Sequence, residues 1–154
     1  MAEVRFYHLT ERPLESVLPV MLEKSLERGW RVAVRGGDPA RIEALSAHLW
    51  TYREESFLPH GTPEDGNAAR QPVWLSCEPA IPNAANTLFL IDGAKAAPEE
   101  LAEMETTAIL FDGLDEAAVA GARAQWKAVT GAGLKAVYWA QSGQGAWVKR
   151  HESA

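Results

Sequence analysis

Cysteine is nearly absent from this sequence, since Cys77 is the single cysteine among 154 residues. One cysteine cannot form an internal disulfide or supply the thiolate cluster of a metal site. Long apolar runs are missing too, because charged residues or glycine interrupt every candidate for the ~20 residues of a membrane span. The opening residues MAEVRFYHLT lack the basic and apolar regions of a secretory signal. We therefore expect a cytoplasmic protein that does not cross a membrane.

Motifs that bind phosphate or metal are also lacking. The glycine pair in RGGDPAR does not extend to G-x-G-x-x-G, and no G-x-x-x-x-G-K-[ST] occurs. The histidines are never three or four residues apart, as two metal ligands on one helical turn would be. The sequence predicts no metal site, no cofactor and no catalytic residue. A Cys77 nucleophile paired with a distant histidine is an alternative, although a buried cysteine in a strand is the more common case.

Acidic residues are missing from one long segment. The formal net charge is −6, yet residues 117–151 contain 5 Lys or Arg and no Asp or Glu, whereas residues 1–116 contain 10 basic and 20 acidic residues. Salt screens potentials beyond about 10 Å, so a basic segment on an acidic body can attract a short acidic ligand to one place. The alternative is a solvated basic face without a partner.

The apolar pattern alternates between short strands and helices. Six runs rich in β-branched and aromatic residues are typical of strands, namely 4–9, 30–34, 72–77, 86–91, 106–111 and 134–140. Helical spacing predicts helices over 14–26, 39–49 and about 115–130. Asp38 is expected to cap the second helix, and Gly29 to end the first. We expect one α/β domain over 1–154, with a mostly parallel sheet and helices on both faces.

Two strands end in Asp-Gly, in LFLIDG (88–93) and AILFDG (108–113). Ligands of open α/β sheets bind outside the carboxyl ends of the strands, so Asp38, Asp92 and Asp112 could hold Mg²⁺ for phosphate chemistry there. A small phosphate- or nucleotide-handling enzyme is therefore one alternative function. Asp-Gly is also ordinary turn chemistry, and the missing phosphate-binding loop favours the turn.

The segment RAQWKAVTGAG places Arg123, Trp126 and Lys127 within one helical turn. At about 100° per residue, Trp126 lies at the boundary of the apolar face, and Arg123, Lys127 and Thr130 continue the same arc. A half-exposed indole beside two cations suits a peptide with an aromatic or aliphatic anchor and a carboxylate. Arg123 would bind the carboxylate through two hydrogen bonds, and Lys127 would add a point charge. The alternative is that Trp126 is a core residue.

Aromatic and basic residues are interleaved through the rest of this segment. Trp126, Tyr138, Trp139 and Trp147 among cations resemble a stacking platform for single-stranded nucleic acid. Five scattered cations on an acidic protein are few for a binder that follows a nucleic-acid backbone. A direct single-stranded nucleic-acid-binding module therefore stays open as a second alternative.

A second aromatic run, LWTYREESFLPHG (49–61), follows the last core position of the second expected helix. Trp50, Tyr52 and Phe57 would mark a protein interface if they are exposed. The alternative is that they pack against the edge of the sheet.

Three segments together resemble one family. RFYHL near the start, LWTYREESFLPH in the middle, and RAQWKAVTGAG with VYWAQSGQGAWVKR near the end look like the chi subunit of bacterial DNA polymerase III holoenzyme. The resemblance implies a Rossmann-like fold and a non-catalytic accessory subunit of the clamp-loader assembly. It implies binding of the acidic, Phe-terminated C-terminal tail of single-stranded DNA-binding protein, and of the psi subunit or a helicase-like partner. DNA would be contacted only indirectly.

The resemblance also implies site residues, position by position. The family's tail-binding arginine, the neighbouring aromatic and the adjoining lysine correspond to Arg123, Trp126 and Lys127. Aromatics of the psi-like face correspond to Trp50 and Phe57. The chain is thus expected to use two separate binding faces.

Two positions depart from the family pattern. A further basic position, one turn beyond the lysine, is Thr130 here, and an apolar pocket position that follows a strand is Asp112. The departures predict either a weaker affinity or a rebuilt tail pocket. In a rebuilt pocket the missing charge would come from Lys135, Lys149 or Arg150.

Overall fold

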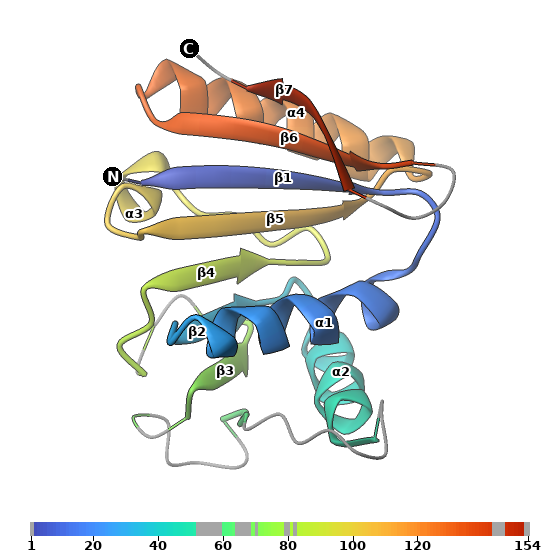
Figure 1. Ribbon diagram of the computed structural model, residues 1–154, viewed down its shortest axis with the longest axis vertical. Coiled ribbons are helices and arrows are strands. Elements are labelled where there is room, and N and C mark those ends of the chain that lie inside the picture. Colours follow the sequence, from blue (N-terminus) through green and yellow to red (C-terminus); the bar gives the residue numbers. More distant parts are fainter. Residues whose placement is uncertain are drawn as a thin grey trace.

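The computed structural model describes residues 2–51, 60–63, 69, 71–78, 81, 83–142 and 147–152. At its centre lies a seven-stranded sheet with the strand order β3-β2-β4-β5-β1-β6-β7 (Figure 1). Helices pack on both faces of this sheet, so the predicted α/β class is confirmed. No helix in the described part of the chain is both long and apolar enough to span a membrane.

Six of the strands coincide with the six predicted runs to within two residues at each end. They are β1 (Glu3–Leu9), β2 (Val32–Arg35), β3 (Val73–Ser76), β4 (Thr87–Leu90), β5 (Thr106–Asp112) and β6 (Lys135–Gln141). Every pairing among these six is parallel. Parallel strands need long crossover connections, which is why helical segments separate most of them in the sequence.

The seventh strand, β7 (Trp147–Glu152), is not predicted by the sequence pattern. All of its residues after Trp147 are exposed, so it lacks the apolar alternation of a half-buried strand. It pairs antiparallel with β6, and the register shifts between Tyr138 and Trp139. Backbone hydrogen bonds to a neighbouring strand therefore place β7, and such bonds leave no apolar pattern in the sequence.

Four helices in the described ranges cover the sheet. α1 (Leu14–Glu27), α2 (Pro39–Thr51) and α4 (Glu116–Gly131) confirm the three predicted helices, and α3 (Pro98–Leu101) is a single unpredicted turn. Residues of α1 and α2 share one core cluster, whereas α3 and α4 contribute to a second. Figure 1 shows the same division, with α1 in front of the sheet and α4 behind β6.

The ends of the helices follow from local chemistry. The Asp38 carboxylate accepts a hydrogen bond from the Ala40 N–H at 3.0 Å, as predicted for the start of α2. Gly29 follows α1 with φ of 78°, which is the left-handed conformation that glycine adopts without steric cost. Asp115 caps α4 by accepting from the backbone N–H groups of two residues in its first turn.

Strand β1 sits between β5 and β6 and serves both core clusters. Val4 and Phe6 pack in the cluster that includes α4, whereas Tyr7 and Leu9 pack in the cluster that includes α1. Successive side chains of a strand point to opposite faces, so β1 forms part of the floor beneath each layer of helices. The two faces of the sheet therefore carry separate surfaces.

Replacing the cap of α4 tests this local account. Asp115→Ala removes the acceptor for both N–H groups, so we expect it to lower the free energy of unfolding by about 1 kcal/mol in urea denaturation. Asp115→Asn keeps an acceptor and is the matched control, so its free energy of unfolding should change by only about 0.3 kcal/mol. An equal loss in the two variants would show that the charge of Asp115, and not its hydrogen bonds, stabilises the helix.

Candidate partner-binding site

The residues predicted to bind the tail lie together on one flank of α4. Ala122 and Val129 turn inward and are buried, whereas Arg123 and Lys127 are exposed. The buried pair anchors the helix on the sheet and so fixes which residues face outward. With neighbours from β6 and β7, the exposed side forms a surface that we call the α4 patch; it comprises Arg123, Trp126, Lys127, Thr130, Tyr138 and His151.

Trp126 is half-buried, so each of the two interpretations of this residue holds in part. Its ring centroid lies 5.2 Å from that of Phe6, 6.2 Å from that of Tyr138 and 5.4 Å from that of His151. One side of the indole therefore packs on the sheet while part of its surface remains in contact with solvent. Trp126 belongs to the core margin and also contributes an aromatic surface beside the cations of the patch.

Tyr138 extends the patch from β6. Its hydroxyl lies 2.5 Å from Nδ1 of His8, which faces the same side of the sheet from β1. Burial raises the pKa of Tyr138 above its ordinary value, and the positive charge of Arg123 opposes that rise. The guanidinium of Arg123 therefore acts on the aromatic part of the patch. Tyr138 and His151 were not assigned to this site from the sequence, because they come from separate strands.

Thr130 lies on the patch as predicted, but its hydroxyl is directed to the helix backbone. Its Oγ1 donates to the carbonyl oxygen of Trp126 at 2.9 Å. This hydrogen bond holds the side chain against α4 and adds no charge. The patch therefore carries the cations of Arg123 and Lys127 and gains none from this position.

Two of the three predicted replacements for the missing charge are engaged elsewhere. Lys135 Nζ lies 2.9 Å from a carboxylate oxygen of Glu152. Lys149 Nζ lies over the ring of Trp139, 5.6 Å from its centroid, on the face of the sheet that carries α1. These contacts do not favour either lysine for the tail pocket, and the assignment stays a prediction. Arg150, which is exposed on β7, stays a prediction.

Asp112 does not lie on the α4 patch. It lines a separate cleft of about 950 Å³, which α4 borders through Ala118, Gly121 and Gln125. At about 100° per residue these three positions point away from Arg123 by nearly half a turn. The departure from the family pattern at Asp112 therefore leaves the charge of the patch unchanged.

The same cleft tests the enzymatic alternative. Asp38, Asp92 and Asp112 all line it, as expected for residues at the carboxyl ends of strands. Each has a structural role: Asp38 caps α2, Asp112 accepts from the Leu114 N–H at 2.9 Å, and Asp92 pairs with Arg41 at 3.1 Å. Among the described residues, no three His, Cys, Asp or Glu are grouped so as to hold a metal ion. The geometry supports the turn interpretation.

Cys77 is also placed unfavourably for nucleophilic catalysis. It is half-buried just beyond the end of β3, and not within the strand as predicted. Burial raises the pKa of its thiol, and the negative charges of Asp38 and Asp92 raise it further. Since the thiolate is the nucleophile, these surroundings suppress its reactivity.

The proposed stacking platform for nucleic acid divides between the two faces of the sheet. Trp126 and Tyr138 pack against the cluster that includes α4, whereas Trp139 and Trp147 pack against the cluster that includes α1. The interpretation of these four rings as one surface is therefore wrong. Alternation along β6 separates Tyr138 from Trp139, although they are adjacent in the chain.

The second predicted face lies largely outside the described residues. Trp50 belongs to the last turn of α2. Its side chain lies outside the described residues, as do Tyr52 and Phe57. Exposure of these aromatics stays a prediction.

Comparison with known proteins identifies relatives of the chain. A family model described as DNA polymerase III chi subunit, HolC, matches residues 1–137. A protein of Rickettsia prowazekii (strain Madrid E), named "Probable DNA polymerase III subunit chi", is 29% identical over 91 residues. That match covers 59% of this chain and 55% of the relative, so the chain spans about half the length of this curated protein.

Titration of the tyrosines tests the geometry of the patch without any partner. Because the charge of Arg123 lowers the pKa of Tyr138, Arg123→Ala should raise it further, as measured by NMR titration of the tyrosine ring carbons. Lys95→Ala, which removes an exposed cation elsewhere, is the control and should leave the titration unchanged. An unchanged pKa of Tyr138 in the Arg123 variant would contradict the placement of the guanidinium.

Proposed function

The chain belongs to the chi subunit family of DNA polymerase III, and from this premise we propose that it is a non-catalytic adaptor. In this role it binds the acidic, Phe-terminated C-terminal tail of single-stranded DNA-binding protein and links the polymerase assembly to coated template. The observation that supports this function most is the α4 patch. A half-exposed indole lies there beside two exposed cations, on a segment without a single carboxylate from residue 117 to residue 151.

Each part of such a tail finds a matching group on the patch. The terminal Phe ring packs against Trp126 and Tyr138, where aromatic contacts are already made within the protein. The Arg123 guanidinium binds the terminal carboxylate through paired hydrogen bonds, a geometry that lysine cannot provide. Lys127 attracts the aspartates that precede the Phe. The orientation of the tail is thus set by the order of these groups along α4, which is the bidentate cation of Arg123, then the indole of Trp126, then the point charge of Lys127.

The magnitudes are consistent with a transient adaptor. Burying one Phe side chain contributes about 1.5–3 kcal/mol, and a hydrogen bond to a charged group about 1.5–3 kcal/mol. The entropy lost on ordering a flexible tail offsets part of this gain. A dissociation constant in the micromolar range corresponds to about −8 kcal/mol, which several such contacts together can supply.

Calorimetric titration with a tail peptide tests the proposal. Arg123→Ala should weaken binding by about tenfold or more, because a charge-assisted pair worth about 1.5–3 kcal/mol is lost, and added salt should also weaken it. Lys95→Ala is the matched control and should bind as the parent does. Removing the last Phe from the peptide should abolish measurable binding. Equal affinity of the Arg123 variant and the parent would refute the site.

A direct single-strand binder is the competing function, and the same preparation can exclude it. Such a protein would hold a naked oligonucleotide with an affinity that falls steeply with salt. An adaptor that contacts DNA only indirectly should show no binding of a 5′-hydroxyl oligonucleotide that Arg123→Ala weakens.

We further propose that the psi subunit, or a helicase-like partner, binds at Trp50 and Phe57. The support is the family resemblance together with the position of α2, which lies at the far end of the sheet from α4 (Figure 1). Partners at the two places would not compete for space.

The separation of the two faces gives a test by double substitution. Trp50→Ala should reduce capture of the psi subunit in a pull-down while leaving affinity for the tail peptide unchanged. Arg123→Ala should show the reverse pattern. If either variant loses both partners while its thermal unfolding matches the parent, the two faces form one site and the proposal of separate interfaces fails.

A further inference from the structure

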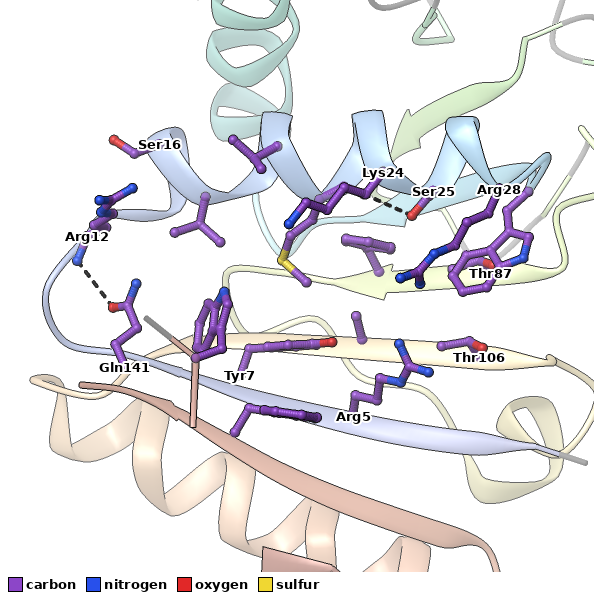
Figure 2. Close-up of a pocket in the computed structure, with 18 residues that line it drawn as sticks. Arg5, Tyr7, Arg12, Ser16, Lys24, Ser25, Arg28, Thr87, Thr106 and Gln141 are labelled. Carbon is purple, nitrogen blue, oxygen red and sulfur yellow. Dashed lines mark hydrogen bonds between the residues drawn. The ribbon is translucent and has the colours of Figure 1, made fainter. Parts of the chain in front are cut away.

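A pocket outside the α4 patch lies on the opposite face of the sheet, between α1 and strands β1, β4, β5, β6 and β7 (Figure 2). Its volume is about 380 Å³, within the range of small-molecule sites. Nothing in the proposed adaptor function uses this pocket.

Four cationic side chains line the pocket, namely Arg5, Arg12, Lys24 and Arg28. Among the described residues, no carboxylate lines it. Arg5 comes from β1 and Arg28 from the end of α1, and Figure 2 shows both guanidinium groups directed into the same space. The Arg5 Nε donates to Glu3 at 2.7 Å, while the Arg28 guanidinium lies 5.1 Å from the ring centroid of Trp30. Two cations that face each other in this way are complementary to an anion placed between them.

Tyr7 adds a hydroxyl to the cationic half of the pocket. It is only 8% exposed, and burial raises its pKa while the positive charges of Arg5 and Arg28 both lower it. The charges of both guanidinium groups, one from β1 and one from the end of α1, therefore reach the same phenol hydroxyl. The hydroxyl of Thr106 lines the same half. Guanidinium and hydroxyl groups in this combination are the donors that recognise phosphate oxygens.

The other half of the pocket is aromatic. Trp139 is the neighbour of Tyr7 across β6 and β1, and the ring of Trp147 meets that of Tyr7 edge-on at 5.0 Å. Ring faces of this kind bind nucleobases by stacking. Arg5 and Tyr7 are two residues apart on one strand and thus about 7 Å apart, comparable with the separation of phosphate and base across one ribose.

Two buried donors in the aromatic half have no hydrogen-bond acceptor in the described structure. They are Nε2 of Gln141, whose side chain is only 7% exposed, and Nε1 of Trp139. The Gln141 Oε1 accepts three backbone N–H bonds, from Thr10 and Glu11 at 2.9 Å and from Arg12 at 3.2 Å. These bonds fix the amide, so its Nε2 is held as a preset donor. Buried donors are normally satisfied, and a nucleobase carries the acceptors that are missing here.

We propose that this pocket binds one nucleoside phosphate unit, with the phosphate between Arg5 and Arg28 and the base against Trp139, where Gln141 donates to it. The unit is either a free nucleotide or the phosphorylated 5′ end of a single strand. The site is distinct from the α4 patch and does not depend on the tail-binding proposal.

The test follows the indole N–H signals of the full chain by NMR during titration with a deoxynucleoside monophosphate. The signals of Trp139 and Trp147 should shift, and that of Trp126 should not. Arg28→Ala removes an exposed side chain and should weaken binding about tenfold or more, whereas Lys95→Ala and Arg123→Ala should have no effect. Gln141→Glu keeps the acceptor for the three backbone N–H groups but loses the donor, so it should also weaken binding.

Three ligands in parallel titrations separate the possible outcomes. If a 5′-phosphorylated oligonucleotide binds more tightly than both its 5′-hydroxyl form and the mononucleotide, the site is assigned to strand ends. If the mononucleotide binds as tightly as the 5′-phosphorylated oligonucleotide, the site is assigned to free nucleotides. Inorganic phosphate that binds as tightly as the nucleotide would overturn the role of the aromatic half. Absence of shifts at Trp139 and Trp147, or displacement of the nucleotide by the tail peptide, would overturn the proposal.

Discussion

Alternation of side chains along β1 and β6 is the constraint on which both proposed binding surfaces depend. These strands pair in parallel register, so Phe6 aligns with Tyr138, and Tyr7 aligns with Trp139. Because neighbours in a strand point to opposite faces, one pair supports the α4 patch and the other lines the pocket under α1. A shift of one residue in this register would move the side chains of one strand to the opposite face of the sheet, so that neither surface would keep its aromatic pair.

Charge distribution in the chain then decides what each surface can bind. After Glu116 in its first turn, α4 carries no further carboxylate, so no acidic side chain of the segment from residue 117 to residue 151 lies beside Arg123 and Lys127, while the acidic remainder of the chain repels other anions. Thr130 and Asp112 depart from the family pattern, yet neither places a negative charge on the patch. The exposed lysines of β6 and β7 are held by Glu152, which keeps them from adding to it. The patch is therefore small, and suits a short tail better than an extended strand.

Sequence patterns predicted the elements that are defined by burial and by local caps. The six parallel strands, the three longer helices and the caps at Asp38 and Gly29 follow from apolar periodicity and from short-range chemistry, and all of them are found. Strand β7 and the turn α3 were missed for a physical reason. The exposed residues of β7 carry no apolar alternation, and α3 is held in part by the distant pair of Glu100 with the buried Arg35.

The sequence by itself determined that Arg123, Trp126 and Lys127 share one arc of a helix, because helical geometry is local and repeats every 3.6 residues. Only the tertiary structure decided what surrounds that arc, since Phe6, Tyr138 and His151 arrive from three different strands. It also divided four aromatic rings between two faces and gathered Arg5, Arg28 and Gln141 around one pocket. Spacing along the chain does not predict such contacts between distant residues, because these residues become adjacent only when strands pair and helices pack.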